Sequence, residues 1–437
     1  MALTFVKPQL SWLRIAEMNL GFFGLQFSFG LQQSNMGPIY SYLGASEATM
    51  PLLWLAGPVT GLIVQPLIGA ISDRTITRLG RRTPYFLVGA ILCSLSLWAM
   101  PHSKALWVAA SILWVLDAAN NVTMEPYRAY AADRLRRDQL PLGYLMQSAF
   151  TGLAQTLAYL APSIMVWSGV RGDLLDSNGI PAVTRVAFAI GAVLSIATIM
   201  WSVVRVPELP IPAEDESAMR SAPVSMATAA TDLKVAFIQM PIPMRQLAVA
   251  MLFQWYAMFA YWQFIVLAIA RGTFGTSDPA SDGFRQAVLL NGQAGGFYNF
   301  VAFLSAFAMV PITKKLDTKW VHASSLAISG AAMIVIFLAV GQISLLLPMI
   351  GIGIGWASMM GNPYVMLADS VPSEKTGTYM GLFNMFIVIP MIIESLTVPL
   401  IYGPLLAGDP RNVLGLAGLL MFAAATATAF MRGPRKI

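Results

Sequence analysis

The chain contains 437 residues, of which 57% are hydrophobic and only 11% are charged, and its mean hydropathy is +0.66. This composition excludes an ordinary soluble enzyme and is typical of a polytopic membrane protein. The net charge of +6 does not indicate nucleic-acid binding, because the basic residues recur between apolar runs instead of forming one patch. The single cysteine, Cys93, cannot form an intrachain disulfide, and the two histidines stand at segment edges, so we expect neither a metal site nor a cofactor.

Apolar segments of about 20 residues are long enough to cross a bilayer as helices. The sequence therefore predicts an all-α membrane protein of twelve transmembrane helices. In chain order the predicted spans cover residues 17–43, 48–72, 84–101, 105–132, 141–168, 184–205, 244–270, 286–313, 320–340, 343–369, 376–403 and 412–431.

The lysines and arginines between the spans are distributed unevenly. If the N-terminus lies in the cytoplasm, most of them fall in cytoplasmic connections, as the positive-inside rule requires. We therefore expect a multi-pass protein of the cell's inner (plasma) membrane, with both termini cytoplasmic.

A polar, Pro-rich stretch separates the sixth and seventh spans. It predicts a six-helix bundle over residues 1–206, a cytoplasmic linker over 207–243 and a second six-helix bundle over 244–437. The two halves also echo each other, because residues 125–128 read Glu-Pro-Tyr-Arg and residues 362–365 read Asn-Pro-Tyr-Val. Such repeats are typical of transporters whose site lies near mid-membrane between the halves.

The fourth span carries an acid near its middle. Asp117 lies about 12 residues into the span, or roughly 18 Å along the helix axis. No basic residue stands one turn away, and burial disfavours the charged form of a carboxyl group. Asp117 is therefore the candidate proton-coupling residue. The alternative is a structural aspartate that is held by hydrogen bonds to neighbours such as Asn121.

Arg128 follows Asp117 by eleven residues and returns to nearly the same helix face about 16 Å further along. Both side chains can therefore line one cavity. Glu125 stands three residues before Arg128 and can pair with it directly. A purely structural role for this pair, which would make Arg128 tolerable in the membrane, stays open.

The connection after the second span begins with Asp73 and Arg74 and ends with Arg81 and Arg82. An acid at a helix end can pair with a basic loop and latch neighbouring helices, so these four residues are expected to be structural or gating. The pattern resembles the cytoplasmic signature loop of the major facilitator superfamily, and it implies that fold, with two pseudo-symmetric halves.

Five further runs resemble sucrose–proton symporters. They are residues 25–34 and 57–66 of the first two spans, 79–84 of the following loop, 116–121 of the fourth span and 379–384 of the eleventh. The resemblance implies a bacterial-type member of the glycoside–pentoside–hexuronide:cation symporter group.

One departure from the plant carriers stands out. Glu125 occupies a position that is usually uncharged in those carriers, so its role can lie outside the plant pattern.

The expected substrate is a neutral disaccharide such as sucrose, maltose or a related α-glucoside. Sugars bind to amides and charged groups and stack on aromatic faces. The candidate substrate-binding residues are Gln26, Gln33, Asn121, Arg128, Trp255, Asn362, Tyr364 and Asn384. The alternatives are interhelical hydrogen bonding for the glutamines and packing or lipid contact for the aromatic residues.

Proton coupling is favoured over sodium coupling, because sodium usually needs several oxygen ligands and the second span offers no carboxylate between Trp54 and Ala70. Glu394, a further acid in the eleventh span, is open to two readings, a second titrating site or a local structural pair.

The sequence thus predicts proton-coupled disaccharide symport by alternating access. It also predicts a protein that works as a monomer with sugar, proton and lipid bilayer as partners. A proton-coupled exporter of amphipathic compounds and a non-transporting sugar sensor are the alternatives. No nucleophile–base set indicates an enzyme.

Overall fold

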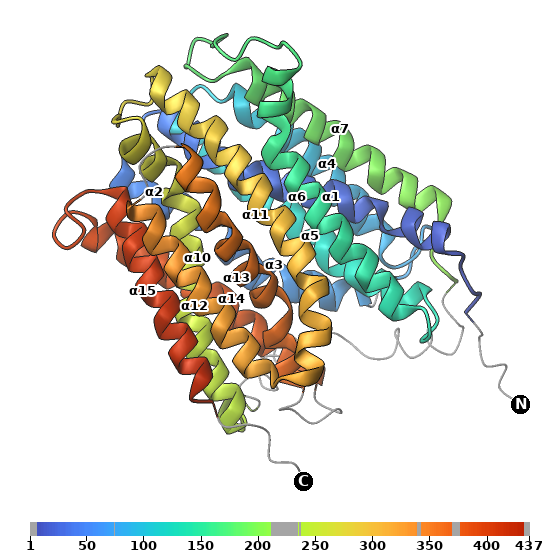
Figure 1. Cartoon of the computed structure of the whole chain (residues 1–437). Helices are drawn as coiled ribbons and strands as arrows, with labels where there is room; N and C mark the ends of the chain where they lie inside the picture. The colour runs from blue at the N-terminus through green and yellow to red at the C-terminus, as the bar shows by residue number, and fades with distance from the viewer. Residues whose placement is uncertain are drawn as a thin grey trace, which may run out of the picture.

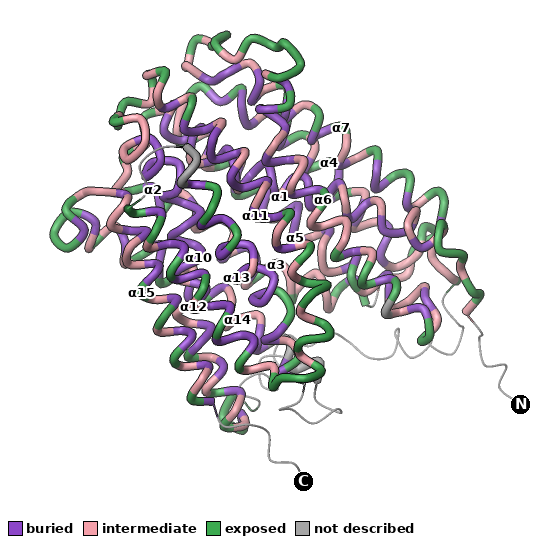
Figure 2. Tube along the Cα trace, in the orientation of Figure 1, coloured by how far each residue is buried: buried purple, intermediate pink, exposed green. Residues whose placement is uncertain are grey.

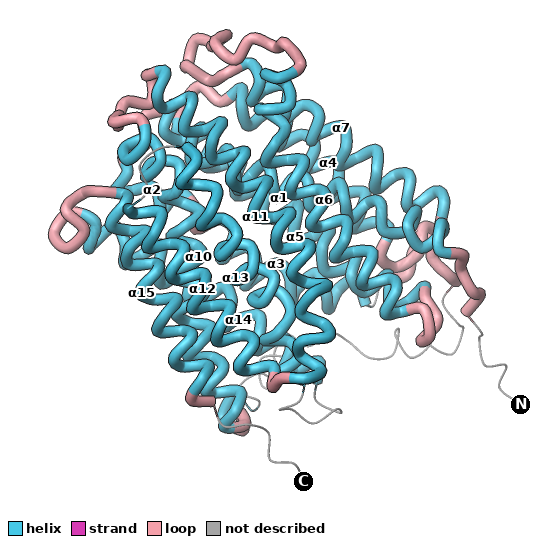
Figure 3. The backbone as a smooth tube through the Cα atoms, viewed as in Figure 1, coloured by secondary structure: helices cyan, strands magenta, loops and turns pink. Residues whose placement is uncertain are grey.

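The computed structural model describes residues 7–73, 75–210, 235, 237–338, 342–368 and 376–431. Helices and the loops between them make up this part of the chain, apart from a single β-bridge between Leu175 and Pro181 (Figure 3). The predicted all-α class is therefore confirmed.

The first part of the chain forms a set of helices that ends before the Pro-rich stretch. Its elements are α1 (Trp12–Tyr42), η1 (Glu47–Thr49), α2 (Met50–Leu53), α3 (Ala56–Asp73), α4 (Thr83–Ala99), η2 (Met100–His102), α5 (Leu106–Arg134), α6 (Leu140–Trp167) and α7 (Ala182–Arg205). The second part comprises α10 (Ile242–Thr273), α11 (Asp282–Lys315), α12 (Thr318–Leu338), α13 (Gln342–Ala368), α14 (Thr376–Tyr402) and α15 (Pro410–Ala429).

Eleven helical segments of the described chain are long and apolar enough to cross a membrane. The remaining predicted span, the first in the chain, is α1, which has 31 residues but carries several amide and hydroxyl side chains, so that its composition is more polar. It runs beside the other helices and packs against α6 and α7. Twelve long helices are thus present in the described residues, as predicted.

Two predicted boundaries are wrong for local reasons. The first helix begins at Trp12 and not at residue 17, because the Ser11 hydroxyl accepts a hydrogen bond of 3.3 Å from the backbone N–H of Arg14 and caps the helix. The predicted second span is divided into η1, α2 and α3, with a break at Trp54 and Leu55.

Helix packing separates the chain into two groups that meet mainly along two pairs of helices. In Figure 1, α4 and α7 lie on the right and α12 and α15 on the left. Within the first group α1 packs against α6 and α7, and within the second α10 packs against α14 and α15. Between the groups, α6 packs against α11 and α3 against α14. The predicted domain limits stay a prediction, and most of the predicted linker lies outside the described residues.

The outer faces of the helices are apolar. Trp107, Leu347 and Leu400 are each more than 70% exposed, and Figure 2 shows exposed segments along the outward sides of the helices and buried segments between them. A surface of this kind matches a hydrocarbon environment. By contrast, α10 is the most enclosed candidate span described, with 83% of its apolar window buried, so it lies at the centre of its group.

Candidate functional site

Asp117 is buried in the middle of α5 and is bound by a neutral partner. Its side chain is 2% exposed, and its Oδ1 accepts a hydrogen bond of 2.7 Å from Nε2 of Gln32 on α1. Its Oδ2 and the Oε1 of Gln32 are both buried without a hydrogen-bond partner among the described residues. A Cβ on Gly57 of α3 would stand only 3.5 Å from Oδ2, so the α3 backbone closes over the carboxyl group. The acid is therefore enclosed on two sides and lacks a cation there.

Asn121, one turn beyond Asp117, belongs to a chain of polar side chains that joins the two helix groups. Asn384 of α14 donates to Oε1 of Gln65 on α3 at 3.0 Å, and Nε2 of Gln65 donates to Oδ1 of Asn121 at 2.6 Å. Nδ2 of Asn121 then donates to the Thr60 hydroxyl at 3.0 Å. Asn121 is thus bound to α3 and does not serve as the partner of Asp117.

The two glutamines that were predicted as ligands have different environments. Gln26 is 7% exposed, and its Oε1 accepts a hydrogen bond of 3.1 Å from Gln155 of α6. Gln33 is half-buried, and its Oε1 is a buried atom without a partner in the described part of the chain. Gln33 consequently keeps a free acceptor, whereas the amide oxygen of Gln26 is engaged in helix–helix contact.

Two tryptophans of α10 pack on one tryptophan of α13. Trp255 lies edge-to-face with Trp356 of α13, with 6.0 Å between ring centroids, and Trp262 lies edge-to-face with the same ring at 5.2 Å. Trp262 Nε1 donates to the Tyr298 hydroxyl at 3.2 Å, while Trp255 Nε1 is buried without a partner among the described residues. Trp255 therefore offers a free donor beside an aromatic face.

Of the two predicted residues of the tenth span, Asn362 is bonded within α13 and Tyr364 contacts a neighbouring helix. Asn362 donates to the Ser358 hydroxyl at 2.7 Å, and the same hydroxyl lies 2.8 Å from Nδ1 of His322. Tyr364 packs on Phe383 of α14 with 4.8 Å between ring centroids. His322 was not singled out from the sequence, and it connects α12 to this cluster.

Arg128 and Glu125 form an ion pair on α5. Their side chains lie 3.2 Å apart, and they are 50% and 30% exposed. Both are thus far more accessible than Asp117. Because of this exposure, the pair contributes little to stability and leaves the guanidinium available to another ligand.

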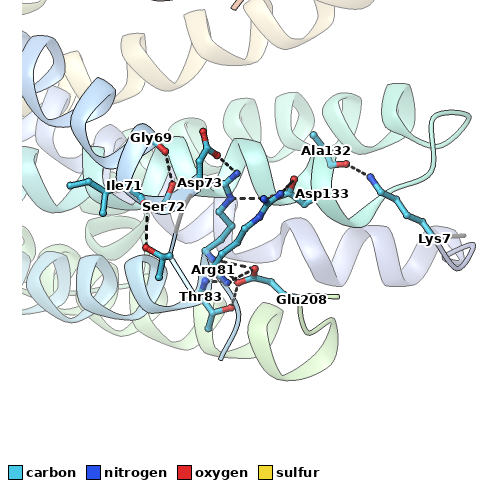
Figure 4. Close-up of polar contacts among 12 residues, drawn as sticks. Lys7, Gly69, Ile71, Ser72, Asp73, Arg81, Thr83, Ala132, Asp133 and Glu208 are labelled. Atoms are coloured by element: carbon cyan, nitrogen blue, oxygen red, sulfur yellow. Dashed lines mark hydrogen bonds and ion pairs between the residues drawn. The ribbon is translucent and has the colours of Figure 1, made fainter. Parts of the chain in front are cut away.

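The loop between α3 and α4 is held by a network that Figure 4 draws. Arg82 pairs with Asp73 and with Asp133 at the end of α5, and Arg81 pairs with the same Asp133. These ion pairs connect the end of α3, the loop before α4 and the end of α5, and a gating role for Asp73, Arg81 and Arg82 stays a prediction. Arg74, the fourth predicted residue, lies outside the described residues.

Glu208, which the sequence reasoning missed, completes this network. Its carboxylate accepts hydrogen bonds from the backbone N–H groups of Arg81 (3.0 Å), Arg82 (2.9 Å) and Thr83 (2.5 Å). Gly80, with φ of +105°, gives the loop the turn that aims these groups at the carboxylate. The signal in the sequence was an acid just beyond the sixth span. We refer to this end of the bundle as the Glu208 end.

The opposite end, which we call the Glu47 end, carries an ion pair between the two helix groups. Arg271 of α10 donates to both carboxylate oxygens of Glu47 at 2.9 Å and to the Gly408 carbonyl at 2.7 Å. The hydroxyl of Tyr402 on α14 also donates to Glu47. A recess of about 560 Å³ lies beside this pair and is lined in part by Asp278. The Glu47 end is therefore closed by contacts between the groups.

Comparison with known proteins agrees with this architecture. The sequence profile of the Major Facilitator Superfamily matches residues 18–395. Sucrose transport protein SUC4 of Arabidopsis thaliana is 26% identical over 428 residues, which cover 88% of this chain and 82% of that protein. Sucrose transport protein SUT5 of Oryza sativa subsp. indica is 24% identical over 457 residues, which cover 91% of this chain and 84% of that protein.

Solved structures share the fold at low identity. The nucleoside transporter NupG (D323A mutant) superposes with a TM-score of 0.72 at 14% identity, covering 95% of this chain and 99% of that one. The POT family transporter PepTSo superposes with a TM-score of 0.68 at 12% identity, covering 97% and 98% of the two chains. The profile match, the twelve long helices and these superpositions agree, and the chain belongs to the Major Facilitator Superfamily.

Proposed function

We propose that this protein carries a neutral disaccharide, sucrose, maltose or a related α-glucoside, together with a proton by alternating access. The observation that carries the proposal is Asp117, a mid-span carboxyl group that is 2% exposed and bound by the Gln32 amide, with no ion pair among the described contacts. A carboxyl group in such a place favours its neutral form and can take up a proton whenever water reaches it. The names of the plant relatives, sucrose transport proteins, support the substrate class.

The polar and aromatic groups that we assign to the site suit a hydroxyl-rich ligand. Gln33 and Trp255 hold an unpaired acceptor and an unpaired donor in the described structure, and a sugar hydroxyl can satisfy both kinds. Asn121 and Asn384 supply further amides, although ligand binding there would have to replace their present bonds to Gln65. A set of groups of this composition favours an uncharged polyol over an amphipathic compound.

Arg128 lies on the Glu208 side of Asp117, and we assign it the role of a hydrogen-bond donor to the sugar. Its guanidinium is half exposed although it pairs with Glu125 at 3.2 Å, so it can donate to a hydroxyl without leaving that pair. Asn362 and Tyr364 are proposed to complete the site from the second helix group, together with Gln26 from α1.

The proposed cycle takes its direction from the charge pattern. The Glu208 end carries the basic loop, so we assign it to the cytoplasm, with both termini on that side and the Glu47 end outside. The two bundles, residues 1–206 and 244–437, would rock about the site as units joined by the linker 207–243. A protein of this kind can work as a monomer in the plasma membrane, because each chain holds a complete site.

Uptake by purified protein in liposomes tests this proposal. With an inward proton gradient, labelled sucrose or maltose should accumulate, an uncoupler should abolish accumulation, and sugar addition should make a lightly buffered external medium more alkaline. Unlabelled glucosides should compete and sugar phosphates should not, because the proposed site has no cluster of unpaired cations.

Two other results would point elsewhere. Uptake that requires added sodium and causes no alkalinisation would refute proton coupling but keep the sugar assignment. Absence of binding by every glucoside would remove the sugar assignment and favour the exporter of amphipathic compounds.

A further inference from the structure

Glu394 on α14 is a second acid buried within a span, and the proposed cycle does not use it. Its side chain is 0% exposed. Its Oε2 accepts hydrogen bonds from Nε2 of Gln263 on α10 at 3.1 Å and from the Ser395 hydroxyl at 3.3 Å. Its Oε1, and the Oε1 of Gln263, are buried without a partner among the described residues. The pair therefore contains two unsatisfied acceptors and no donor for them.

The same arrangement occurs at Asp117. There too a glutamine N–H donates to one carboxyl oxygen, while the other carboxyl oxygen and the amide oxygen are left without a donor in the described structure. Gln32 follows the start of α1 by about 20 residues, and Gln263 follows the start of α10 by nearly the same number. The first helix of each group thus presents a glutamine to a buried acid at a similar depth.

One proton supplies what such a pair lacks. A protonated carboxyl group is a donor through its O–H and an acceptor through its carbonyl oxygen. An amide has the complementary donor and acceptor, so acid and amide can satisfy each other at two points. With the carboxyl group ionised, both free oxygens stay buried and unpaired, which is costly in a membrane interior.

The elements packed against α14 supply few other ionisable groups at this depth. From α10, Tyr256 reaches α14, and its hydroxyl lies 2.8 Å from the Thr397 hydroxyl. The sequences of α2, and of α3 before Asp73, contain no ionisable side chain. From η1, Glu47 is held by Arg271 and Tyr402 at the end of the bundle. No described contact therefore brings a cation to Glu394.

We propose that Glu394 and Gln263 form a second proton-binding site, loaded in the same transport cycle as Asp117; the inference rests on the proposed function. A proton from external water binds the Oε1 lone pair and returns to water on the other side, with no other bond made or broken. Glu394 lies eight residues before Tyr402, or about 12 Å along the helix, so release of the Glu47 contacts opens the shortest route to it.

The number of charges moved per sugar tests this. In liposomes held at a set membrane potential, the sugar gradient at which net flux reverses gives that number. The wild type should move two charges per sugar and Glu394→Gln one, so that the gradient sustained by 100 mV falls by about 50-fold. Asp173→Asn, which removes an exposed carboxylate of an outer loop, is the matched control and should keep two.

The outcomes separate the two proposals. A wild type that moves no proton refutes the proposed function itself. A coupled wild type with one charge per sugar, or a Glu394→Gln variant that keeps two, overturns the role of Glu394 and leaves Asp117 in place. If sodium replaces the second proton and the number of charges per sugar stays two, the Glu394–Gln263 site does not bind a proton.

Infrared spectroscopy keeps the proposal testable if Glu394→Gln does not fold. In Asp117→Asn, one band of a buried protonated carboxyl group should remain and should change when sugar is added. Gln263→Leu in that background leaves the acid in place but removes the hydrogen bond that Gln263 donates to it, so the band should shift. Absence of any such band across the range of pH at which the protein is folded would overturn the second site.

Discussion

Gln32 donates a hydrogen bond of 2.7 Å to Asp117 and thereby joins α1 to α5 at the buried acid. The bond supports a charged carboxylate as well as a neutral carboxyl group, so the acid can change its protonation state without losing this partner. A basic partner would have fixed the charge, and a purely apolar pocket would have excluded it. A neutral amide is the partner that a reversible proton carrier needs.

The first prediction concerns Asp117 itself. Asp117→Asn keeps the shape of the side chain but cannot release a proton. The variant should therefore lose uncoupler-sensitive accumulation and only equalise the sugar concentration across the membrane. Exchange of labelled for unlabelled sugar should survive. The measurement is uptake and counterflow in the same liposomes. Full proton-driven accumulation by this variant would remove Asp117 from the coupling mechanism.

The second prediction concerns Gln32. Gln32→Leu removes the donor that stabilises the carboxylate, and a hydrogen bond to a charged group contributes about 1.5–3 kcal/mol. The midpoint of the uptake–pH profile should therefore move to higher pH by about one unit or more. Gln155→Leu is the matched control, because this glutamine donates to the neutral Gln26 amide, and its midpoint should not move. Equal uptake–pH profiles for the two variants would mean that Gln32 has only a packing role.

The third prediction concerns Arg128. Lysine keeps the charge and the pairing with Glu125 but lacks the planar fork of donors. Arg128→Lys should therefore raise the sugar concentration at half-maximal uptake by at least about tenfold, as expected for lost charged hydrogen bonds. Normal affinity and rate in Arg128→Lys would mean that charge balance with Glu125 is the whole role of the arginine.

The fourth prediction concerns the ion pair between Glu47 and Arg271. The partners are 22% and 27% exposed, so the pair is worth about 1 kcal/mol, and Glu47→Gln should favour opening of the Glu47 end by roughly fivefold. Ser41, which lines the recess and is 5% exposed, can report this as Ser41→Cys with an impermeant maleimide. Arg171→Gln, which breaks an exposed ion pair in a loop near the same recess, is the control. Unchanged labelling in Glu47→Gln would mean that other contacts keep this end closed.

The fifth prediction concerns Gly80. A Cβ at this position would meet the Glu208 carboxylate at 2.6 Å, and the residue has φ of +105°. Gly80→Ala should destabilise the protein by about 1–3 kcal/mol and lower its Tm. Gly44 has φ of +86°, and a Cβ added there would meet no atom within 4 Å, so Gly44→Ala isolates the backbone strain. A Gly80→Ala that loses no more stability than Gly44→Ala would show that Glu208 adjusts without cost.

The spans could be predicted from the sequence because each is an apolar run of membrane length, which depends on composition alone. The start of α1 could not, since it is set by the hydrogen bond between the Ser11 hydroxyl and the backbone N–H of Arg14, which hydropathy does not register. The break between α2 and α3 was hidden in a continuous apolar segment. Local chemistry, rather than hydropathy, decides both boundaries.

The candidate site was only partly predictable for a different reason. Asp117 is visible in the sequence because an acid in an apolar run is rare. Its partner depends on how α1 is rotated against α5, and the adjacent Gln32 and Gln33 cannot be told apart without that rotation. The contact between Gln65 and Asn384 spans 319 residues of sequence and arises only from the packing of α3 on α14. Interhelical partners of this kind are properties of the assembled bundle.

The binding of Glu208 to the loop after Gly80 has a mechanical consequence. Glu208 belongs to the segment that follows α7, while Arg81, Arg82 and Thr83 lead into α4, and Asp133 of α5 is clamped by the same two arginines. The contacts therefore hold α4, α5 and α7 together at one end, and we expect these three helices to move as a rigid body. A force applied to the chain at Glu208 would tilt the helix that carries Asp117, although Glu208 lies far from that acid in the sequence.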